Sequence, residues 1–213
     1  MRSRYYPAVA RQGWWFIFFL LAAALFLISF CNWVSSLPLW LAAALVAYLF
    51  RDPERRIPAK PLGLIAPVDG RVVAAEEGED PYLERRASRI RLKGSATGSY
   101  VVRSPMEGKL LKQWYAVPGG ESRSRALLAS WIQSDEGDDV VLVIRPRIGW
   151  LRLRSNISPG ERTGQGMRFC FSPFGAEVEV WMPPATRIET QPGQSVCSGS
   201  DIIGTLNHDA QKR

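Results

Sequence analysis

The feature that most constrains this chain is an uncharged stretch near its N-terminus. Residues 12–50, a stretch of 39 positions, contain no Asp, Glu, Lys or Arg. One membrane-spanning helix needs about 20 apolar residues, so the stretch is long enough for two. Turn-forming residues and a proline at positions 32–38 favour a break at its centre. We therefore predict spans at about residues 14–31 and 37–50. The second is short, which is compatible with little tilt, a thinned bilayer or a re-entrant segment.

Basic residues flank both ends of the apolar stretch, and its central loop is uncharged. They are Arg2, Arg4 and Arg11 on one side and Arg51, Arg55, Arg56 and Lys60 on the other. The positive-inside rule then places both ends in the cytoplasm, with the protein in the inner (cytoplasmic) membrane. A cleaved signal peptide is disfavoured because a second apolar stretch follows directly. The alternative is a buried hydrophobic hairpin in a soluble protein.

Short strands are predicted for the rest of the chain, because glycine and proline recur and the apolar segments are brief. The predicted strands are at residues 71–74, 89–92, 140–144, 150–153 and 177–181. Residues 122–134 are either a helix or a loop. The expected domains are a membrane anchor of two helices at 1–50 and a β-rich domain at 51–213. We expect Trp114, Trp131, Trp150 and Trp181 to fill the core.

Two local repeats suggest a duplicated architecture. PVDGRVV at residues 67–73 recurs as PMEGKLL at 105–111, and PGE at 159–161 followed by Gly166 recurs as PGQ at 192–194 followed by Gly199. The first pattern predicts a proline turn, an acid that accepts backbone hydrogen bonds, and a glycine with positive φ before a strand. Both patterns are similar to half-motifs of lipoyl- and biotinyl-type domains. The expected fold class is therefore all-β, a duplicated hybrid-motif barrel-sandwich preceded by a transmembrane helical hairpin.

The charge balance and the cysteine content limit the kinds of binding partner and metal site that we expect. The net charge is +7, but residues 51–213 carry only +4, because 24 basic side chains there face 20 acidic ones. So small an excess gives weak support for nucleic acid, and we expect no nucleic-acid partner. It suits an anionic membrane surface. Three separated cysteines and the single His208 fit neither a disulfide framework nor a zinc site, so we expect no structural metal.

Two other functions are compatible with lipoyl-like halves. A lipoyl or biotinyl carrier needs a lysine at a hairpin tip, and no such turn is present. A membrane-fusion adaptor inserts a long heptad hairpin between the halves, whereas residues 108–140 have no heptads. The adaptor remains a distant alternative.

Four segments carry a stronger resemblance: FRDPER at 50–55, APVDGRV at 66–72, RSPMEG at 103–108, and 157–180 with Arg168 and Phe174 in register. Together these segments resemble phosphatidylserine decarboxylases of the short, membrane-anchored type. The resemblance extends from the apolar hairpin to about Leu206. The resemblance implies a proenzyme that cleaves itself at a Gly-Ser bond to form a pyruvoyl group. That group serves as the electron sink for decarboxylation, and an aspartate and a histidine assist the serine.

This sequence departs from the family pattern at two positions. By the resemblance, Asp69 matches the aspartate, Tyr100 stands at the histidine, and Ala176, after Gly175, stands at the self-cleaving serine. A methyl group cannot attack a carbonyl, and Tyr100, with an ordinary pKa of about 10, is a poor base at neutral pH. We therefore expect neither self-processing nor a pyruvoyl cofactor. The expected function is a non-catalytic lipid- or partner-binding homologue in phospholipid metabolism.

Alternatives remain at the site. An active decarboxylase, converting phosphatidylserine to phosphatidylethanolamine and CO2, would need a displaced serine. Ser172 lies about 13 Å from position 176 along an extended strand, and Ser198 and Ser200 flank a distant turn. Asp69 has a structural alternative, because an acid in such a turn often caps backbone amides, as Glu107 would in the repeat.

A run of alternating arginines suggests a lipid contact. Arg145, Arg147, Arg152 and Arg154 alternate with apolar residues and so can share one face. Such faces are usually only solvated. A nearby bilayer favours contact with phosphatidylserine or another anionic lipid, since each basic residue adds about 1 kcal/mol there. The sequence does not indicate an oligomeric state.

Overall fold

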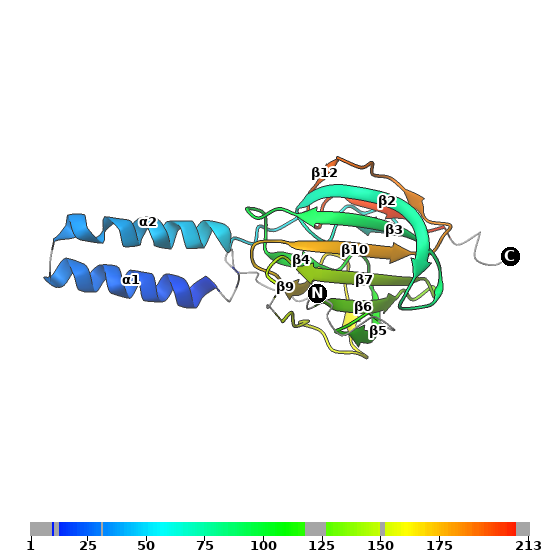
Figure 1. Ribbon diagram of the computed structural model, residues 1–213, viewed down its shortest axis with the longest axis horizontal. Coiled ribbons are helices and arrows are strands. Elements are labelled where there is room, and N and C mark those ends of the chain that lie inside the picture. Colours follow the sequence, from blue (N-terminus) through cyan, green and yellow to red (C-terminus); the bar gives the residue numbers. More distant parts are fainter. Residues whose placement is uncertain (1–9, 11–12, 31, 118–126, 150–151, 208–213) are drawn as a thin grey trace. The chain divides into compact units, whose positions relative to one another are not determined.

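The structure is a computed structural model that describes residues 10, 13–30, 32–117, 127–149 and 152–207. The chain forms two compact units, Met1–Glu54 and Arg55–Arg213. The first contains the helices α1 (Gly13–Phe30) and α2 (Trp33–Leu49), and the described part of the second is built of β-strands (Figure 1).

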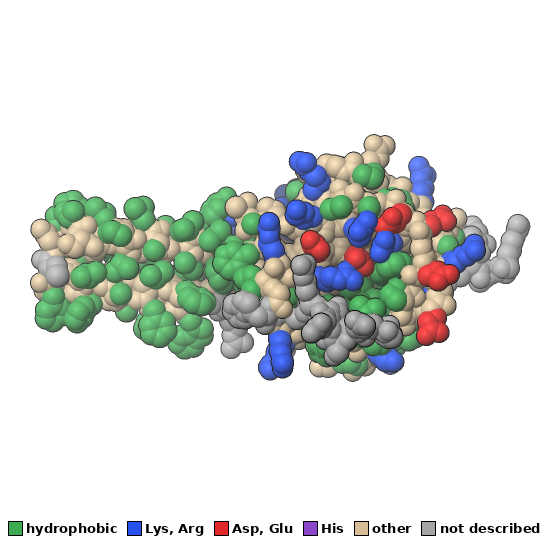
Figure 2. Space-filling view, in the orientation of Figure 1, with side chains coloured by type: hydrophobic (Ala, Val, Ile, Leu, Met, Phe, Trp, Pro, Cys, Tyr) green, Lys and Arg blue, Asp and Glu red, His purple; other side chains and the backbone are tan. Residues whose placement is uncertain are grey.

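Two apolar helices lie side by side in the N-terminal unit (Figure 1), and hydrophobic side chains cover them in Figure 2. By length and composition, α1 is able to cross a membrane, and α2 is a shorter apolar helix. Most of their large side chains are exposed, including Trp15 and Phe30. This exposure does not support the alternative of a buried hairpin.

The predicted start of the second helix, residue 37, is wrong by four positions. The helix α2 begins at Trp33 and includes Pro38. A proline near a helix start removes only one backbone hydrogen bond, and membrane helices tolerate it. The Ser36 hydroxyl donates to the Trp33 carbonyl at 2.7 Å, which satisfies one polar group of this first turn.

A basic residue contacts the C-terminal end of α2. Arg51 donates from Nη1 to the Tyr48 carbonyl at 3.0 Å, and its guanidinium carbon lies 4.0 Å from the centre of the Tyr48 ring. A cation at a helix C-terminus is favourable because the last carbonyls carry partial negative charge. Arg51 therefore helps to end the apolar helix where charged sequence begins.

The described part of the second unit is folded into antiparallel sheets. Its strands are β1 (Gly63–Ile65), β2 (Gly70–Asp80), β3 (Arg85–Gly94), β4 (Val101–Arg103), β5 (Gly108–Trp114), β6 (Leu128–Gln133), β7 (Asp139–Pro146), β8 (Arg162–Thr163), β9 (Arg168–Phe171), β10 (Ala176–Met182), β11 (Arg187–Ile188), β12 (Ser195–Val196) and β13 (Ile202–Thr205). An eight-stranded sheet has the order β12-β2-β3-β10-β7-β6-β5-β8, and smaller sheets join β1-β13-β11 and β4-β9. The large sheet curls around the main hydrophobic core (Figure 1).

Two halves of this unit have matching strand pairings. The order of the eight-stranded sheet is symmetric when β2 is matched with β5, β3 with β6, β10 with β7 and β12 with β8. The β1–β13 ladder shifts register after Leu64, and the β4–β9 ladder shifts at the equivalent position, after Val102. The β2–β3 and β5–β6 ladders carry bulges after Val72 and Leu110. The sequence repeats therefore occupy equivalent places in the fold.

Backbone hydrogen bonds link the halves reciprocally. The Arg103 N–H donates to the Pro67 carbonyl at 2.9 Å, and the Ile65 N–H donates to the Pro105 carbonyl at 3.0 Å. The PG turns are equivalent too, because Gly193 donates to Val72 at 2.8 Å and Gly160 to Leu110 at 2.7 Å. Each half thus satisfies backbone groups in the other.

The glycines of the PxxG repeat do not take the predicted positive φ. Positive φ occurs instead at glycines of other turns, among them Gly160, Gly166, Gly193 and Gly199. Gly70 and Gly108 are required by close backbone approach. A Cβ at Gly70 would lie 2.1 Å from the Lys93 carbonyl oxygen, and one at Gly108 would lie 2.3 Å from that of Gln133.

Most predicted strands are confirmed, with two corrections. Residues 71–74, 89–92, 140–144 and 177–181 lie in β2, β3, β7 and β10. Within 122–134, residues Leu128–Gln133 form the strand β6 rather than a helix, because pairing with β5 and β7 on both sides overrides the ambiguous composition. In the predicted strand 150–153, Arg152 and Leu153 are not in a strand, and Trp150 and Leu151 lie outside the described residues.

Three of the four tryptophans that were predicted to fill the core lie in or against a hydrophobic cluster. Trp181 is buried in a second hydrophobic cluster, against which Trp114 and Trp131 pack partly buried. The centres of the Trp114 and Tyr82 rings lie 5.3 Å apart. Trp150 lies outside the described residues.

We predict that Gly108→Ala lowers the unfolding free energy by about 3 kcal/mol, because the new methyl group must displace backbone of β6. Thermal unfolding of the detergent-solubilised chain, followed by near-UV circular dichroism, measures the loss. Gly149→Ala is the control, since a methyl group added at Gly149 would meet no atom within 4 Å. Equal melting shifts for the two variants would contradict the close-approach argument.

Candidate functional site

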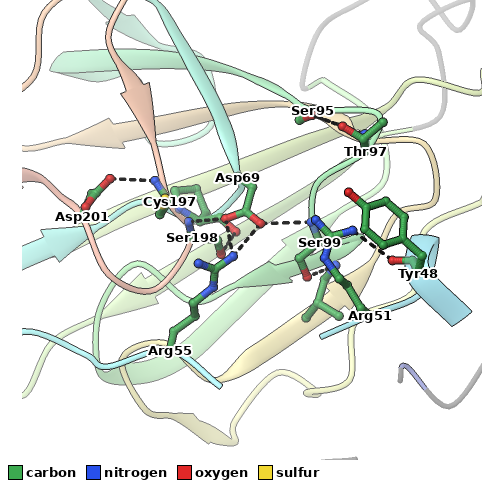
Figure 3. A network of polar contacts seen from close by, with 12 residues as sticks. Tyr48, Arg51, Arg55, Asp69, Ser95, Thr97, Ser99, Cys197, Ser198 and Asp201 are labelled. Carbon is green, nitrogen blue, oxygen red and sulfur yellow. Dashed lines mark hydrogen bonds and ion pairs between the residues drawn. The ribbon is translucent and has the colours of Figure 1, made fainter. Parts of the chain in front are cut away.

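Four hydrogen bonds converge on the carboxylate of Asp69, at the start of β2 (Figure 3). Oδ1 accepts from the backbone N–H of Ser198 at 2.7 Å and from Arg55 Nη2 at 3.2 Å. Oδ2 accepts from the backbone N–H of Ser99 at 3.0 Å and from the same arginine nitrogen at 3.0 Å. A carboxylate has about four lone-pair positions, so these contacts fill its accepting capacity.

Asp69 therefore joins three chain segments. Arg55 and Asp69 form an ion pair with side chains only 25% and 15% exposed, which limits its screening by solvent. Ser198 lies between β12 and β13, and its hydroxyl donates to the Pro67 carbonyl at 3.0 Å. The structure thus supports the capping role of Asp69 that was one of its two predicted roles.

Tyr100 is packed as a core side chain. It is 2% exposed, its hydroxyl donates to the Ala96 carbonyl at 2.9 Å, and its ring centre lies 5.7 Å from that of Phe174. Its backbone carbonyl accepts from Ser172 N–H at 2.8 Å. A phenol that donates to a carbonyl in this way is not arranged to remove a proton from a nucleophile.

A tight turn joins β9 to β10. Phe174 and Gly175 have φ values of 61° and 86°, and a Cβ at Gly175 would lie 2.9 Å from the Gly94 carbonyl oxygen. Ala176 follows and is buried. Ser95, next to Gly94, donates its N–H to the Asp69 carbonyl at 2.8 Å. The loop after β3 therefore lies between the Asp69 turn and the Gly175 turn, and it gathers the predicted site residues into one region.

The predicted distance of Ser172 from the site is wrong. Ser172 is buried, and its hydroxyl donates to the Gly175 carbonyl at 3.3 Å. The estimate of about 13 Å assumed an extended strand, whereas residues 172–175 form a turn. Ser172 thus lies beside the carbonyl that precedes Ala176.

Sequence reasoning missed three partners of Asp69: Arg55, Ser99 and Ser198. Arg55 lies in the FRDPER segment, so its motif was a usable signal. Ser198 was set aside because it flanks a turn far from the family register, yet its N–H meets Asp69 across 129 positions of sequence. Only the pairing of β12 with β2 brings it there.

The four predicted lipid-binding arginines separate into two groups. Arg145 is half-buried and forms an ion pair with Glu179 of the neighbouring strand β10 at 2.6 Å. Arg147, Arg152 and Arg154 are exposed. The shared lipid-binding face stays a prediction, and Arg145 differs from the other three arginines in having a carboxylate partner.

The three exposed arginines lie in segments next to the Gly175 turn. The Arg147 N–H donates to the Gly175 carbonyl at 3.3 Å. Ser155 forms an antiparallel bridge with Cys170, so residues 152–154 run beside the chain that follows Cys170. Phe174, at the tip of this turn, is 47% exposed although it is a large aromatic residue.

The Cys170 thiol, in the strand before the Gly175 turn, is not a reactive group. Burial raises the pKa of the Cys170 thiol to about 12, so it stays protonated and unreactive at neutral pH. Among the described residues, no group of three or more His, Cys, Asp or Glu side chains is placed to hold a metal ion.

Comparison with known proteins identifies similar chains. Residues 42–204 match the family described as phosphatidylserine decarboxylase. The phosphatidylserine decarboxylase proenzyme of Nitrosomonas eutropha is 39% identical, over 95% of this chain and 98% of its own length. Those of Nitrosomonas europaea and Burkholderia ambifaria are 35% and 32% identical, over 97% and 94% of this chain and 100% and 97% of their own lengths. No solved structure matches the chain.

We predict that Asp69→Asn lowers the unfolding free energy by about 2 kcal/mol, because an amide nitrogen would face backbone N–H donors and leave the arginine unpaired. The matched control is Glu107→Gln in the repeated turn, where the side chain is exposed and the change is expected within about 0.5 kcal/mol. Thermal melts of both variants provide the test. Indistinguishable melts for Asp69→Asn and the unsubstituted chain would argue against the capping role.

Proposed function

The chain belongs to the phosphatidylserine decarboxylase family, and from this premise we propose that it is a membrane-anchored member that does not self-process. In this proposal it binds phospholipid without decarboxylating it. The observation that carries the proposal is the alanine after Gly175, at the position that resembles the self-cleaving serine.

The residues at this position do not fit a pyruvoyl group. The carbonyl of such a group derives from a serine side chain, and Ala176 has only a methyl group. Among the described residues, neither Tyr100 nor Asp69 is arranged as a base beside it, because Tyr100 donates its proton to Ala96 and the accepting positions of Asp69 are filled. These contacts support a scaffolding role for the former acid–base pair.

Ser172 is the best-placed alternative nucleophile, and its chemistry does not lead to the family's electrophile. Attack of its hydroxyl on the Gly175 carbonyl would form an ester and release Ala176 as the new N-terminus. An N-terminal alanine carries an amine and no ketone, so it cannot hold an amino substrate as a Schiff base. Ser198 has its hydroxyl hydrogen-bonded to Pro67 and its N–H bound to Asp69. The active decarboxylase is the second candidate; only the closeness of Ser172 to the Gly175 carbonyl favours it, and the chemistry of that attack argues against it.

The architecture in this proposal is a duplicated hybrid-motif barrel-sandwich. The matched register shifts and bulges of the two halves support duplication. The membrane-fusion adaptor alternative is not retained, because the described residues between the repeats form β5 and β6 rather than a helical hairpin.

Lipid contact is proposed at the Gly175 turn. Phe174 offers an exposed ring, and Arg147, Arg152 and Arg154 offer exposed cations in neighbouring segments. An aromatic side chain with flanking arginines suits the interface of an anionic bilayer, where the ring is buried and the cations meet phosphates. Arg145 is not part of this contact because Glu179 pairs with it.

The proposed location is the inner membrane, with the β-rich unit on the cytoplasmic side. The basic residues on both flanks of the apolar helices support this orientation by the positive-inside rule. The contact of Arg51 with the end of α2 supports an interfacial position for that residue.

We expect the purified protein to be one intact chain of 23.8 kDa. Intact-mass spectrometry under denaturing conditions separates this outcome from two fragments with a blocked N-terminus on the smaller one. Ala176→Ser alone should also stay intact, since the serine would lack a base. A pyruvoyl-terminated fragment from the unsubstituted chain would refute the proposal. Cleavage of Ala176→Ser/Tyr100→His would show that the geometry remains competent once both groups are restored.

We expect a fluorophore at Phe174→Cys, in a chain without its native cysteines, to be quenched by nitroxide-labelled lipid in anionic vesicles. The variant Arg152→Gln/Arg154→Gln should lower the docking equilibrium constant about 30-fold, because each arginine adds about 1 kcal/mol near the surface. High salt should act in the same direction. The control label replaces Glu79, an exposed residue at the far end of β2. Equal quenching at both positions would contradict docking through the turn.

A further inference from the structure

The hairpin that joins β2 to β3 extends beyond the sheet. The strand β10 pairs with β3 only as far as Ser88, and β12 pairs with β2 only at Gly70 and Arg71. In the part of the chain that the structure describes, the strands of residues 78–87 therefore pair only with each other. A two-stranded hairpin is marginally stable by itself in water, so this segment, the strap, depends on side-chain contacts with the rest of the unit.

The strap lies against the face of the large sheet that is opposite the main core. Alternate residues of β7 belong to the main core and to the second hydrophobic cluster, which also contains Tyr82 and Ala87 of the strap. Successive side chains of a strand face opposite sides of a sheet, so the strap covers the side away from the main core. Figure 1 shows β2 bending at the right of the view, past β10 and β7.

An arginine and a tyrosine fasten the strap to this face. Arg85 Nη2 donates to the Asp139 carbonyl at 2.6 Å, and Arg85 Nη1 lies 3.7 Å from the Asp139 carboxylate. The centres of the Tyr82 and Trp114 rings lie 5.3 Å apart. Both contacts use side chains of the strap, so the strap can lift without breaking a backbone ladder of the large sheet.

Buried polar atoms without a hydrogen-bond partner gather at the strap. Among the described residues they include Asp80 Oδ2, Tyr82 Oη and Arg85 Nε on the strap, and Arg89 Nε and Trp181 Nε1 on the strands beside it. Buried polar atoms of folded proteins are normally paired, because an unpaired one costs free energy. The closed strap thus leaves unpaired several groups that water would reach if the strap opened.

The carboxylate of Asp80 makes the closed strap sensitive to pH. The side chain is completely buried, and its Oδ1 accepts the Tyr82 N–H at 2.9 Å. Burial raises the pKa of the Asp80 carboxyl above its ordinary value, and the Tyr82 N–H and the positive charge of Arg85 offset only part of this effect. The closed strap therefore favours the protonated carboxyl.

Other charged groups lie on the strap and on the strands beneath it. Those on the strap are Glu79, Glu84, Arg85 and Arg86. Those on the strands that it packs against are Lys112 of β5, Asp139 and Arg145 of β7, and Glu179 of β10. Arg145 pairs with Glu179, and Arg85 pairs with Asp139. The arginine whose charge acts on Asp80 thus also serves a second carboxylate.

From this arrangement we propose that the strap is a pH-responsive lid over the tryptophans of the outer face, opened by ionisation of the buried Asp80 carboxyl and closed by its protonation. In the open strap the carboxyl meets water and regains its ordinary pKa of 3.8. The stability that protonation gives the closed strap is complete below that value and is lost as the pH rises through the raised pKa. This device goes beyond the proposed lipid contact and does not depend on whether the chain self-processes.

The test is hydrogen–deuterium exchange of the full-length protein in detergent at pH 4 and pH 8, followed by mass spectrometry and corrected for the intrinsic pH dependence of amide exchange. We expect the protection of residues 78–87 to fall at pH 8, while that of residues 140–145 in β7 stays constant. Asp80→Asn keeps the shape of the side chain without its charge. It should raise the protection of the strap about tenfold at pH 8 and remove the pH difference.

Two further variants separate the carboxylate from the arginine contact. Glu79→Gln, which removes an exposed carboxylate on the same strap, is the matched control and should keep the pH difference. Arg85→Gln removes the contact with Asp139 and should lower the protection of the strap about tenfold at pH 4.

Two results would overturn the proposal. They are a protection of residues 78–87 in the unsubstituted chain that does not change between the two pH values, and a pH difference that Asp80→Asn leaves intact. Constant exchange of the β7 residues shows that each variant stays folded. The response of the unsubstituted chain needs no variant, and it is measured independently of the vesicle and intact-mass experiments. Failure here is therefore distinguishable from failure of the proposed function.

Discussion

Two reciprocal backbone hydrogen bonds, from Arg103 to Pro67 and from Ile65 to Pro105, place each PxxG turn of the β-rich unit against the other half. Buried backbone groups must be paired, so neither half can satisfy its turns alone. The positions of Asp69 and Glu107 follow from this constraint, because each acid sits two residues after one of these prolines. The Asp69 turn and the Glu107 turn are thus both positioned by this one pair of reciprocal hydrogen bonds.

The two equivalent acids have different surroundings. Asp69 meets the loop before β4, the turn after β12 and the side chain of Arg55, and its carboxylate joins them. Glu107 is one methylene longer and remains exposed beside a cavity. A substitution at residue 176 therefore need not disturb the junction that Asp69 makes. The remaining contacts of Asp69 are made to backbone groups and to Arg55, which do not involve residue 176.

Much of the fold was predictable because its signals are local. The apolar stretch and its flanking arginines predict the helix pair, and short alternating or apolar runs bounded by turn residues predict β2, β3, β7 and β10. Residues 122–134 were ambiguous since β6 is set by partners on both sides. The closeness of Ser172 to Gly175 was not predictable from period-two geometry, because a left-handed residue at Phe174 turns the chain back. The pairing of Arg145 with Glu179 was not predictable either, because Glu179 lies on the neighbouring strand.

The sequence by itself determined the apolar helix pair, the repeats, the family and the missing hydroxyl at residue 176, since each is a property of residue type and order. Tertiary structure alone decided which groups meet: Ser198 with Asp69 across 129 positions, Arg55 on the same carboxylate, and a cavity beside Glu107. The physical reason is that such contacts depend on strand register and on the volume left between side chains. Both quantities arise only when distant segments pair.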